Sequence, residues 1–431
     1  MRELHVHINS ERVGVLSEED NIWAFTYNTD WLENADSYPL SQYIPLTANK
    51  QMDGSTRRHI QWFFDNLLPE ESARALLARD VKVAMADAFG LLEACGAESA
   101  GAITLLRPGE SIPEGAFKPL SAQELSERIS KLPDVPLNAE SRKRMSLAGA
   151  QHKMLVIWHQ GQLFEPSGQM PSSHILKPEH VKPNYYWQTV RNEWFAMNLA
   201  DKVGLDVPDT TVCYVPEAVY VIERFDRSGC FPGQSRLHVL DGCQLLGLSR
   251  SDKYTQSTVA QLKEFAGSCR SKGVTKLTVF RWALFNALLG NGDAHLKNLS
   301  CFSTPKGYAF TPLYDLLCTA IYSETGQHLS SDLSQPMGNA EKLGELSYAD
   351  ILQFGSDLGL PARLCDKEIR KMLDAIIPEA NQLYESVAAN KEVQNKAGEL
   401  RMLRQIIELV IKEMAKLVQD SMPSTFEAGV G

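Results

Sequence analysis

The chain has 431 residues, of which 44% are hydrophobic and 22% are charged, a mixture that excludes global disorder and a fibrous repeat. At this length we expect two or three domains. The formal net charge of -10 argues against unaided binding of the whole surface to nucleic acid or anionic membrane. We expect a cytoplasmic protein without a membrane span, and the eight scattered cysteines predict reduced thiols and no zinc site.

Residues 1–105 are predicted to form a small antiparallel sheet followed by helices. Apolar and polar residues alternate over residues 5–8, 13–16 and 22–27, as is typical of strands. Residues 106–145 contain several prolines and glycines, and we expect a connecting segment with one short helix near residues 121–132.

The rest of the chain is predicted to form two further parts, residues 146–236 and 237–431. The first part has strand-like runs at 154–158, 174–177 and 219–222, with a helix from about 190 to 203. The second is mostly helical, and its helix over residues 278–289 is apolar nearly all round and therefore expected to be buried. Apolar residues from Leu400 to Leu417 recur at helical spacing, which favours packing on a helical lobe over binding of a partner helix.

The densest polar cluster, residues 289–298, follows this apolar helix directly. Asp293 and Asn298 are five residues apart, as in the kinase catalytic loop, where the Asp accepts the substrate hydroxyl proton and the Asn binds magnesium. Taken alone, the pair also fits a loop with an Asx turn and a solvated Lys297. Asp315, predicted to end a short apolar strand, adds the second carboxylate that a magnesium–phosphate site needs.

Two residues upstream fit the same plan. Lys177 ends a predicted strand, from which a lysine can reach phosphates, and Glu193 lies sixteen residues later on an amphipathic helix, in a position to pair with it. The order of strand lysine, helix glutamate, catalytic Asp, Asn and metal Asp matches that of kinases.

The chain has neither G-x-G-x-x-G nor the P-loop motif. Small residues around Gly149 offer backbone N–H groups to phosphates, although this segment also fits a plain turn. Residues 221–227 are predicted to form a strand leading to a hinge whose backbone meets an adenine edge. The charges of this segment, taken alone, also fit a surface salt-bridge cluster.

Five motifs in order resemble the HipA toxin kinases of bacterial toxin–antitoxin modules: S-L-A-G-A-Q-H-K (146–153), I-L-K (175–177), E-R-F-D-R (223–227), G-D-A-H-L-K-N (292–298) and P-L-Y-D (312–315). The resemblance covers roughly residues 1–420. It implies an α+β, divergent protein-kinase-like (HipA-like) fold, with a small N-terminal sheet plus helices and a mostly helical C-terminal lobe.

The resemblance further implies a serine/threonine protein kinase that uses ATP and Mg²⁺. Asp293 would be the catalytic base, Asn298 and Asp315 would hold the metal, and Glu193 would form a structural ion pair. Ser146 aligns with the serine that family members autophosphorylate, which switches the kinase off, and His152 stands where the family loop often has an acid. The residues expected to contact ATP are Ala148, Gly149, Ala150, Gln151, His152, Lys153, Lys177, Glu223, Arg224, Phe225, His295, Leu296, Lys297, Asn298, Tyr314 and Asp315.

The resemblance also implies partners. A HipB-like helix-turn-helix antitoxin would neutralise the kinase and co-repress the operon with it, so that operator DNA is contacted mainly through the antitoxin. The family's known targets are aminoacyl-tRNA synthetases, with glutamyl-tRNA synthetase the target of the best-known type, and their phosphorylation arrests growth. Two other functions stay open, namely a small-molecule phosphotransferase of kinase-like fold and a non-catalytic corepressor.

Overall fold

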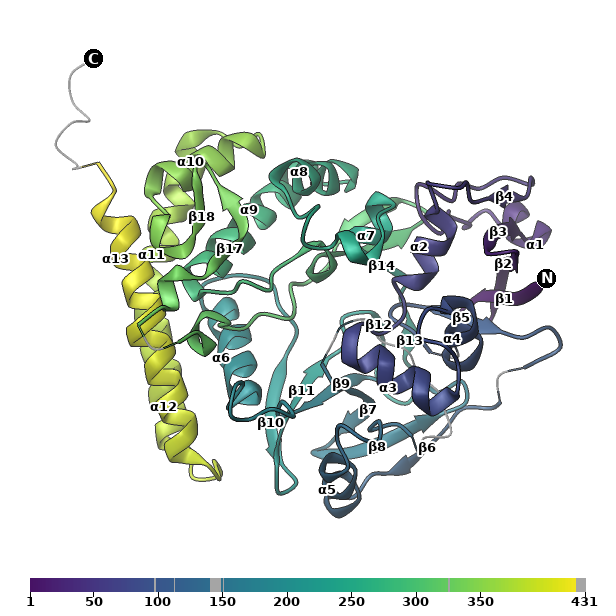
Figure 1. Ribbon diagram of the computed structural model, residues 1–431, viewed down its shortest axis with the longest axis horizontal. Coiled ribbons are helices and arrows are strands. Elements are labelled where there is room, and N and C mark those ends of the chain that lie inside the picture. Colours follow the sequence, from purple (N-terminus) through teal and green to yellow (C-terminus); the bar gives the residue numbers. More distant parts are fainter. Residues whose placement is uncertain (97, 112, 140–148, 150, 325, 424–431) are drawn as a thin grey trace. The chain divides into compact units, whose positions relative to one another are not determined.

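The structure is a computed structural model that describes residues 1–96, 98–111, 113–139, 149, 151–324 and 326–423 (Figure 1). The chain forms two compact units. The first consists of Met1–Val181, Pro208–Lys253 and Leu299–Thr311, and the second of Lys182–Val207, Tyr254–Asn298 and Pro312–Gly431. Each unit thus combines segments that are distant in the sequence. The division into four parts at residues 105, 145 and 236 stays a prediction.

The N-terminal sheet of the first unit is antiparallel, in the order β4-β3-β2-β1-β5. Alternation along β1 places Leu4, Val6 and Ile8 in the core. Positive φ angles at Asp20 and Asn21 close the turn between β2 and β3. The predicted antiparallel sheet is confirmed, and β4 and β5 extend it at its edges. In the order of the sheet, the strands span Gln51–Met52, Ile22–Tyr27, Glu11–Glu19, Arg2–Ile8 and Ile103–Leu106.

Four helices accompany this sheet, and aromatic side chains join two of them to it. The Phe64 ring of α2 lies 6.1 Å from that of Phe25 on β3, and Phe89 of α4 meets Trp23 edge-on at 5.2 Å. These apolar contacts form the core of the N-terminal region. The helices are α1 (Thr29–Glu33), α2 (His59–Asp65), α3 (Glu71–Val81) and α4 (Ala88–Cys95).

The second sheet of the first unit is also antiparallel, in the order β10-β11-β9-β7-β8-β6. Leu176 on β9 pairs with Met154 on β7 and with Val221 on β11, and all three belong to one apolar core. Because β9 lies between two hydrogen-bonded neighbours, the backbone of Lys177 is held on both sides. The predicted strands at 154–158, 174–177 and 219–222 are confirmed as β7, β9 and β11. In sheet order, the strands span Thr210–Tyr214, Ala218–Glu223, His174–Pro178, Met154–His159, Gln162–Ser167 and Ala116–Pro119.

The predicted connecting segment, residues 106–145, also contributes to this sheet. Its short helix is confirmed as α5 (Ala122–Ser130), which begins after Ser121, whose Oγ accepts the Glu124 N–H at 3.1 Å. The strand β6 is not predicted from the sequence. Its four residues are all exposed and end in Pro119, so they show no alternation of apolar and polar residues that would indicate a strand. The connection is therefore partly built into the sheet that it leads to.

A buried carboxylate ties α5 and β6 to β8. Glu165 on β8 has a side chain only 2% exposed and lies 2.8 Å from Arg128 and 2.9 Å from Lys118. Burial alone would raise the pKa of Glu165, but hydrogen bonds from the two cations outweigh it and hold the pKa below its ordinary value. Glu165 is therefore ionised at neutral pH.

The first unit also contains a two-stranded ribbon within residues 146–236 and a sheet within the region predicted to be mostly helical. A ribbon, β12 (Arg227–Ser228) and β13 (Ser235–Arg236), is followed by a sheet of β14 (Val239–Asp241), β15 (Ser300–Thr304) and β16 (Gly307–Phe310). Helix α7 (Gly242–Leu246) begins at the end of β14.

The second unit is mainly helical, with one hairpin of β17 (Asp332–Met337) and β18 (Ala340–Lys342). The predicted helices near 190–203 and 278–289 are confirmed as α6 and α9, and α9 starts earlier than predicted. All residues from Trp282 to Leu289 are buried, as their apolar composition predicts. The helices are α6 (Thr189–Lys202), α8 (Val259–Ser268), α9 (Lys272–Leu289), α10 (Tyr348–Asp357), α11 (Ala362–Ala389), α12 (Lys396–Ile406) and α13 (Lys412–Asp420).

The C-terminal apolar stripe packs into the core of the second unit. Helices α12 and α13 run along α11 (Figure 1) and are joined by a π-helical turn, Ile407–Ile411. Leu403, Val410 and Met414 are buried, which confirms the prediction of core packing. The wider π-helical turn shifts the buried face by one residue, so that Val418 is buried where the stripe predicts Leu417.

Among the helices that the structure describes, none combines the length and apolar composition needed to cross a bilayer.

Glu165→Gln should lower the free energy of unfolding by about 3 kcal/mol, because it leaves the buried Arg128 guanidinium without its main counter-charge. Equilibrium unfolding in denaturant measures the loss. Glu408→Gln is the control, since Glu408 pairs with Lys412 on an exposed helix face, where such pairs contribute under about 1 kcal/mol. Equal losses in the two variants would contradict the role given to Glu165.

Candidate active site

The polar loop after α9 is fixed by the way the helix ends. Gly290 adopts a left-handed conformation (φ 71°), and a Cβ there would lie 2.6 Å from a Val410 methyl carbon. Glycine is therefore required at this turn. Its carbonyl accepts the backbone N–H groups of Thr319 and Ala320 at 3.1 and 2.9 Å. The loop thus begins from a buried and hydrogen-bonded helix end.

Asp293 is held by an asparagine that the sequence analysis does not single out. Asn291 is 1% exposed, donates from Nδ2 to Asn286 Oδ1 at 2.8 Å, and accepts the Asp293 N–H on Oδ1 at 3.0 Å. This is the Asx turn named as the alternative for the loop. Here the turn orients Asp293, so the two interpretations do not exclude each other. The N–H of Gly292 donates to Thr319 Oγ1 at 2.7 Å and fixes the residue between them.

Tyr254 is a second residue that sequence reasoning misses. Its hydroxyl donates to Asp293 Oδ1 at 2.5 Å, and its ring meets that of His295 edge-on at 4.9 Å. The Tyr254 side chain is half exposed, and Asp293 is partly buried. Tyr254 lies 39 residues before Asp293, and no motif or spacing links the two in the sequence.

Asn298 and Asp315 are in direct contact, as the kinase pattern requires. Asn298 Nδ2 donates to Asp315 Oδ2 at 3.0 Å, while Asn298 Oδ1 accepts the His295 N–H at 2.9 Å. Asp315 does not end a strand, contrary to the prediction, because β16 stops at Phe310. Asp315 instead lies in a left-handed conformation (φ 60°), which is uncommon for residues other than glycine and which aspartate adopts more readily than most.

The remaining predicted residues of this loop shape it from within. His295, Leu296 and Lys297 are buried, so the alternative of a solvated Lys297 is wrong. The Tyr314 hydroxyl donates to the Lys297 carbonyl at 2.7 Å and ties the loop to the segment that carries Asp315. Glu193 is buried on α6, and its pairing with Lys177 stays a prediction.

The first unit carries the predicted phosphate-binding residues. Lys177 is 6% exposed on β9, and its Nζ lies 5.8 Å from the ring centre of Tyr220, which stands opposite it on β11. Of the predicted phosphate loop, Ser146, Ala148 and Ala150 lie outside the described residues.

The described part of the predicted phosphate loop lines a small cavity. Gly149, Gln151, His152 and Lys153 face residues of α3 and the segment 136–138 around a volume of about 60 Å³. The Gly149 carbonyl accepts the N–H of Glu70 at 3.2 Å. Burial, with a smaller contribution from His180, lowers the pKa of His152, so this imidazole is neutral at pH 7.

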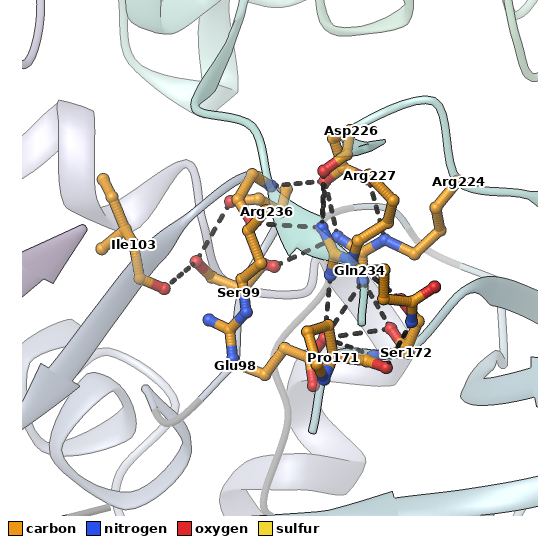
Figure 2. Close-up of polar contacts among 12 residues, drawn as sticks. Glu98, Ser99, Ile103, Pro171, Ser172, Arg224, Asp226, Arg227, Gln234 and Arg236 are labelled. Carbon is orange, nitrogen blue, oxygen red and sulfur yellow. Dashed lines mark hydrogen bonds and ion pairs between the residues drawn. The ribbon is translucent and has the colours of Figure 1, made fainter. Parts of the chain in front are cut away.

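The predicted hinge ends in a buried charge cluster. Glu223 is exposed at the end of β11, whereas Arg224 and Asp226 are buried and paired at 2.6 Å (Figure 2). The alternative of a surface salt-bridge cluster is therefore wrong. The Arg224 side chain is engaged in this cluster, and its contact with ATP stays a prediction.

Comparison with known proteins identifies the family. The family model described as the HipA-like C-terminal domain matches residues 145–380, and that of the HipA N-terminal domain matches residues 4–106. The chain belongs to the HipA family. The serine/threonine-protein kinase toxin HipA of Shewanella oneidensis is 32% identical over 84% of each chain. The putative kinase Y4mE of Sinorhizobium fredii is 31% identical over 88% of this chain and 93% of its own length.

A solved structure extends the likeness to the whole fold. It is described as the Shewanella oneidensis MR-1 toxin–antitoxin system HipA, HipB and its operator DNA complex. The chain matches it with a TM-score of 0.78 at 27% identity, over 97% of this chain and 99% of the other. The predicted family, the α+β HipA-like fold and the serine/threonine kinase class are thereby confirmed.

The donor set of this HipA-type kinase suits a hard divalent cation. Carboxylate and amide oxygens are ligand types that Mg²⁺ accepts, and the two side chains are adjacent, with Asn298 Nδ2 donating to Asp315 while Asn298 Oδ1 accepts the His295 N–H. Asp293 is held separately by Asn291 and Tyr254. The loop therefore distinguishes one carboxylate suited to metal from one suited to a proton.

Asn291→Ala should reduce phosphoryl transfer at least tenfold and lower the free energy of unfolding by about 1–3 kcal/mol. It removes the acceptor that orients Asp293 and leaves the buried Asn286 amide oxygen without that donor. Initial rates and denaturant unfolding measure the two effects. Asn390→Ala is the control, because Asn390 Oδ1 accepts the Glu392 N–H in a similar turn on the exposed surface. It should change neither the transfer rate nor the free energy of unfolding. Unaltered transfer by Asn291→Ala would show that the turn does not position the base.

Proposed function

We propose that the chain is an ATP- and Mg²⁺-dependent kinase toxin that phosphorylates a serine or threonine of a cytoplasmic protein. The observation that carries this proposal is the arrangement after α9, where Asp293 is oriented by two neighbours and Asn298 contacts Asp315. Phosphoryl transfer depends chiefly on positioning and electrostatic stabilisation, which such an arrangement supplies.

The roles follow from the chemistry of each side chain. Asp293 accepts the proton of the substrate hydroxyl as the phosphoryl group is transferred, while Asn298 and Asp315 hold the metal. Magnesium, when bound, neutralises charge on the phosphates. Lys177 contacts the phosphates together with the loop from Ala148 to Lys153.

The adenine and the rest of the nucleotide are assigned to the other predicted residues. The adenine edge meets the backbone of Glu223–Phe225, while the segment His295–Lys297 and Tyr314 shape the loop beside the nucleotide. Because His295 and Lys297 are buried, we assign them to holding the shape of the loop and not to direct contact with the nucleotide through mobile side chains.

Partners and regulation follow the family. We place a HipB-like helix-turn-helix antitoxin as the partner that neutralises the kinase and reaches operator DNA, since the solved relative is described in complex with HipB and operator DNA. A net charge of -10 agrees with DNA contact made mainly through that partner. The target is an aminoacyl-tRNA synthetase, glutamyl-tRNA synthetase by analogy, and phosphorylation of Ser146 switches the kinase off. A phosphate there would repel the triphosphate of ATP.

Asp293→Asn should abolish phosphoryl transfer, by at least about 10³-fold, with the folded structure retained, because it replaces the base by a group of the same shape. Intact-mass and peptide mass spectrometry after incubation with ATP and Mg²⁺ measures the transfer. The wild type is expected to gain one phosphate, at Ser146, and the variant none. The gain should disappear when EDTA replaces Mg²⁺.

Two results would contradict this proposal. Transfer by Asp293→Asn at the wild-type rate would reject the assignment of the base. Absence of phosphate from a wild-type protein that binds ATP would favour a small-molecule phosphotransferase or a non-catalytic corepressor.

Tyr254→Phe should lower kcat about tenfold and leave the KM for ATP within a factor of two, because the lost hydroxyl contacts the base. Steady-state kinetics separates the two constants. The matched control is Tyr348→Phe, which removes a similar hydrogen bond to Asp366 elsewhere in the second unit and should leave both constants unchanged. A kcat that rises in Tyr254→Phe would mean that the hydroxyl competes with the substrate for Asp293.

A further inference from the structure

Two acidic residues and two arginines form a buried cluster of ion pairs in the first unit, which we call the hinge cluster: Glu98, Arg224, Asp226 and Arg227 (Figure 2). Their side chains are 0, 2, 8 and 4% exposed, respectively. Glu98 Oε1 lies 2.8 Å from Arg227 and 3.7 Å from Arg224, and Asp226 Oδ2 lies 2.6 Å from Arg224 and 3.2 Å from Arg227. Each carboxylate therefore serves both guanidinium groups.

The hinge cluster pairs two guanidinium groups with two carboxylates, and the buried Arg236 adds a further positive charge nearby. Burial alone would raise the pKa of Asp226, but Arg224 and then Arg227 outweigh it and lower the pKa to about 2. Burial, with repulsion by Arg224, lowers the pKa of Arg227 to about 10, which still leaves it charged at neutral pH. The two guanidinium groups, with Arg236 nearby, thus depend on both carboxylates, and Glu98 supplies one of them.

The hinge cluster joins three segments that are distant in the sequence. Glu98 comes from the region matched by the HipA N-terminal domain, and the Asp226 carboxylate also accepts the N–H of Gly101 there at 2.7 Å. The other charges follow β11 directly, and the first of them, Arg224, lies within the predicted adenine contact Glu223–Phe225. The third segment contains Ser172, next to the start of β9.

Ser172 links the hinge cluster to the strand that carries Lys177. Its hydroxyl donates to Glu98 Oε1 at 2.9 Å and accepts from Arg224 at 3.1 Å, and its carbonyl accepts from Arg227 Nε at 2.7 Å. The carbonyl of Ser173 accepts the Arg224 N–H at 2.9 Å, and β9 begins at the next residue. The ends of β9 and β11 are therefore held by the same buried charges.

We infer that Glu98 is a positioning residue for the nucleotide: from the N-terminal domain it fixes the hinge backbone through Arg224 and Arg227. This inference rests on the proposed function, which assigns the adenine to that backbone. Without the Glu98 charge, two buried guanidinium groups share one carboxylate, and the excess charge is relieved when residues 224–227 shift toward water. The displaced hinge binds the nucleotide less well, in the ground state and the transition state alike.

Glu98→Gln should therefore raise the KM for ATP and the calorimetric Kd for ADP with Mg²⁺ by about tenfold or more, with kcat within about threefold of the wild type. Full-length protein is used for both measurements. Glu165→Gln is the matched control. It removes from β8 a carboxylate of similar burial that also pairs with two cations, Arg128 and Lys118. It should destabilise the fold and leave the KM and the Kd within a factor of two. Glu98→Asp, which retains the charge, should recover most of the affinity.

If Glu98→Gln does not fold, Ser172→Ala tests the inference instead. It keeps all four charged side chains and removes the hydroxyl that contacts both Glu98 and Arg224. We expect a rise in the Kd for ADP of about threefold. The inference would be overturned by an unchanged Kd for ADP in Ser172→Ala, or by equal KM values for ATP in Glu98→Gln and Glu165→Gln. The proposed function would still stand in either case if the wild type transfers phosphate. A wild type that binds no ADP would overturn both.

Discussion

The catalytic loop depends on a polar turn that starts from an apolar helix. Helix α9 is buried over its last two turns, so the groups that end it must find partners inside the protein. Gly290 supplies the left-handed turn, and Asn291 links Asn286 of the helix to the backbone of Asp293. The same constraint that buries the helix therefore makes the loop rigid. A rigid loop holds a carboxylate at a fixed position for proton transfer, without cost at the moment of reaction.

In the second unit a polar loop leaves a buried apolar helix, whereas in the first unit charged side chains are themselves buried, at positions where apolar residues could also fill the core. Buried ion pairs contribute little net stability compared with well-packed apolar residues, since removing charges from water is costly. Glu165 fastens α5 and β6 to the sheet, while Glu98 fastens the hinge. The geometry of each pair is therefore more informative than its energy. A guanidinium that meets two carboxylates fixes both direction and distance, which an apolar contact does not.

Local patterns in the sequence predict most of the inner strands of the two large sheets and helices such as α5, α6 and α9, since alternation and helical spacing report burial directly. The motif residues Asp293, Asn298 and Asp315 are predicted because the kinase pattern fixes their spacing along one loop. Patterns fail where a contact joins distant segments. Tyr254 reaches Asp293 across 39 residues, and Glu98 reaches Arg227 across 129. The strand expected to reach Asp315 ends at Phe310, shortly before Pro312, which has no N–H to donate to a strand partner.

The hinge cluster bears on how the two sequence domains of the HipA family are related. Family models match residues 4–106 and 145–380 separately, and a boundary between them suggests independent modules. The buried charges cross that boundary, since Glu98 belongs to one match, and Ser172, Arg224, Asp226 and Arg227 to the other. The C-terminal match alone would contain Arg224 and Arg227, with Arg236 nearby, against the single carboxylate of Asp226, an excess of positive charge that a buried site does not tolerate. If the hinge binds the nucleotide as we propose, the Glu98 carboxylate makes the N-terminal domain a part of that hinge, although none of its residues is assigned to the nucleotide.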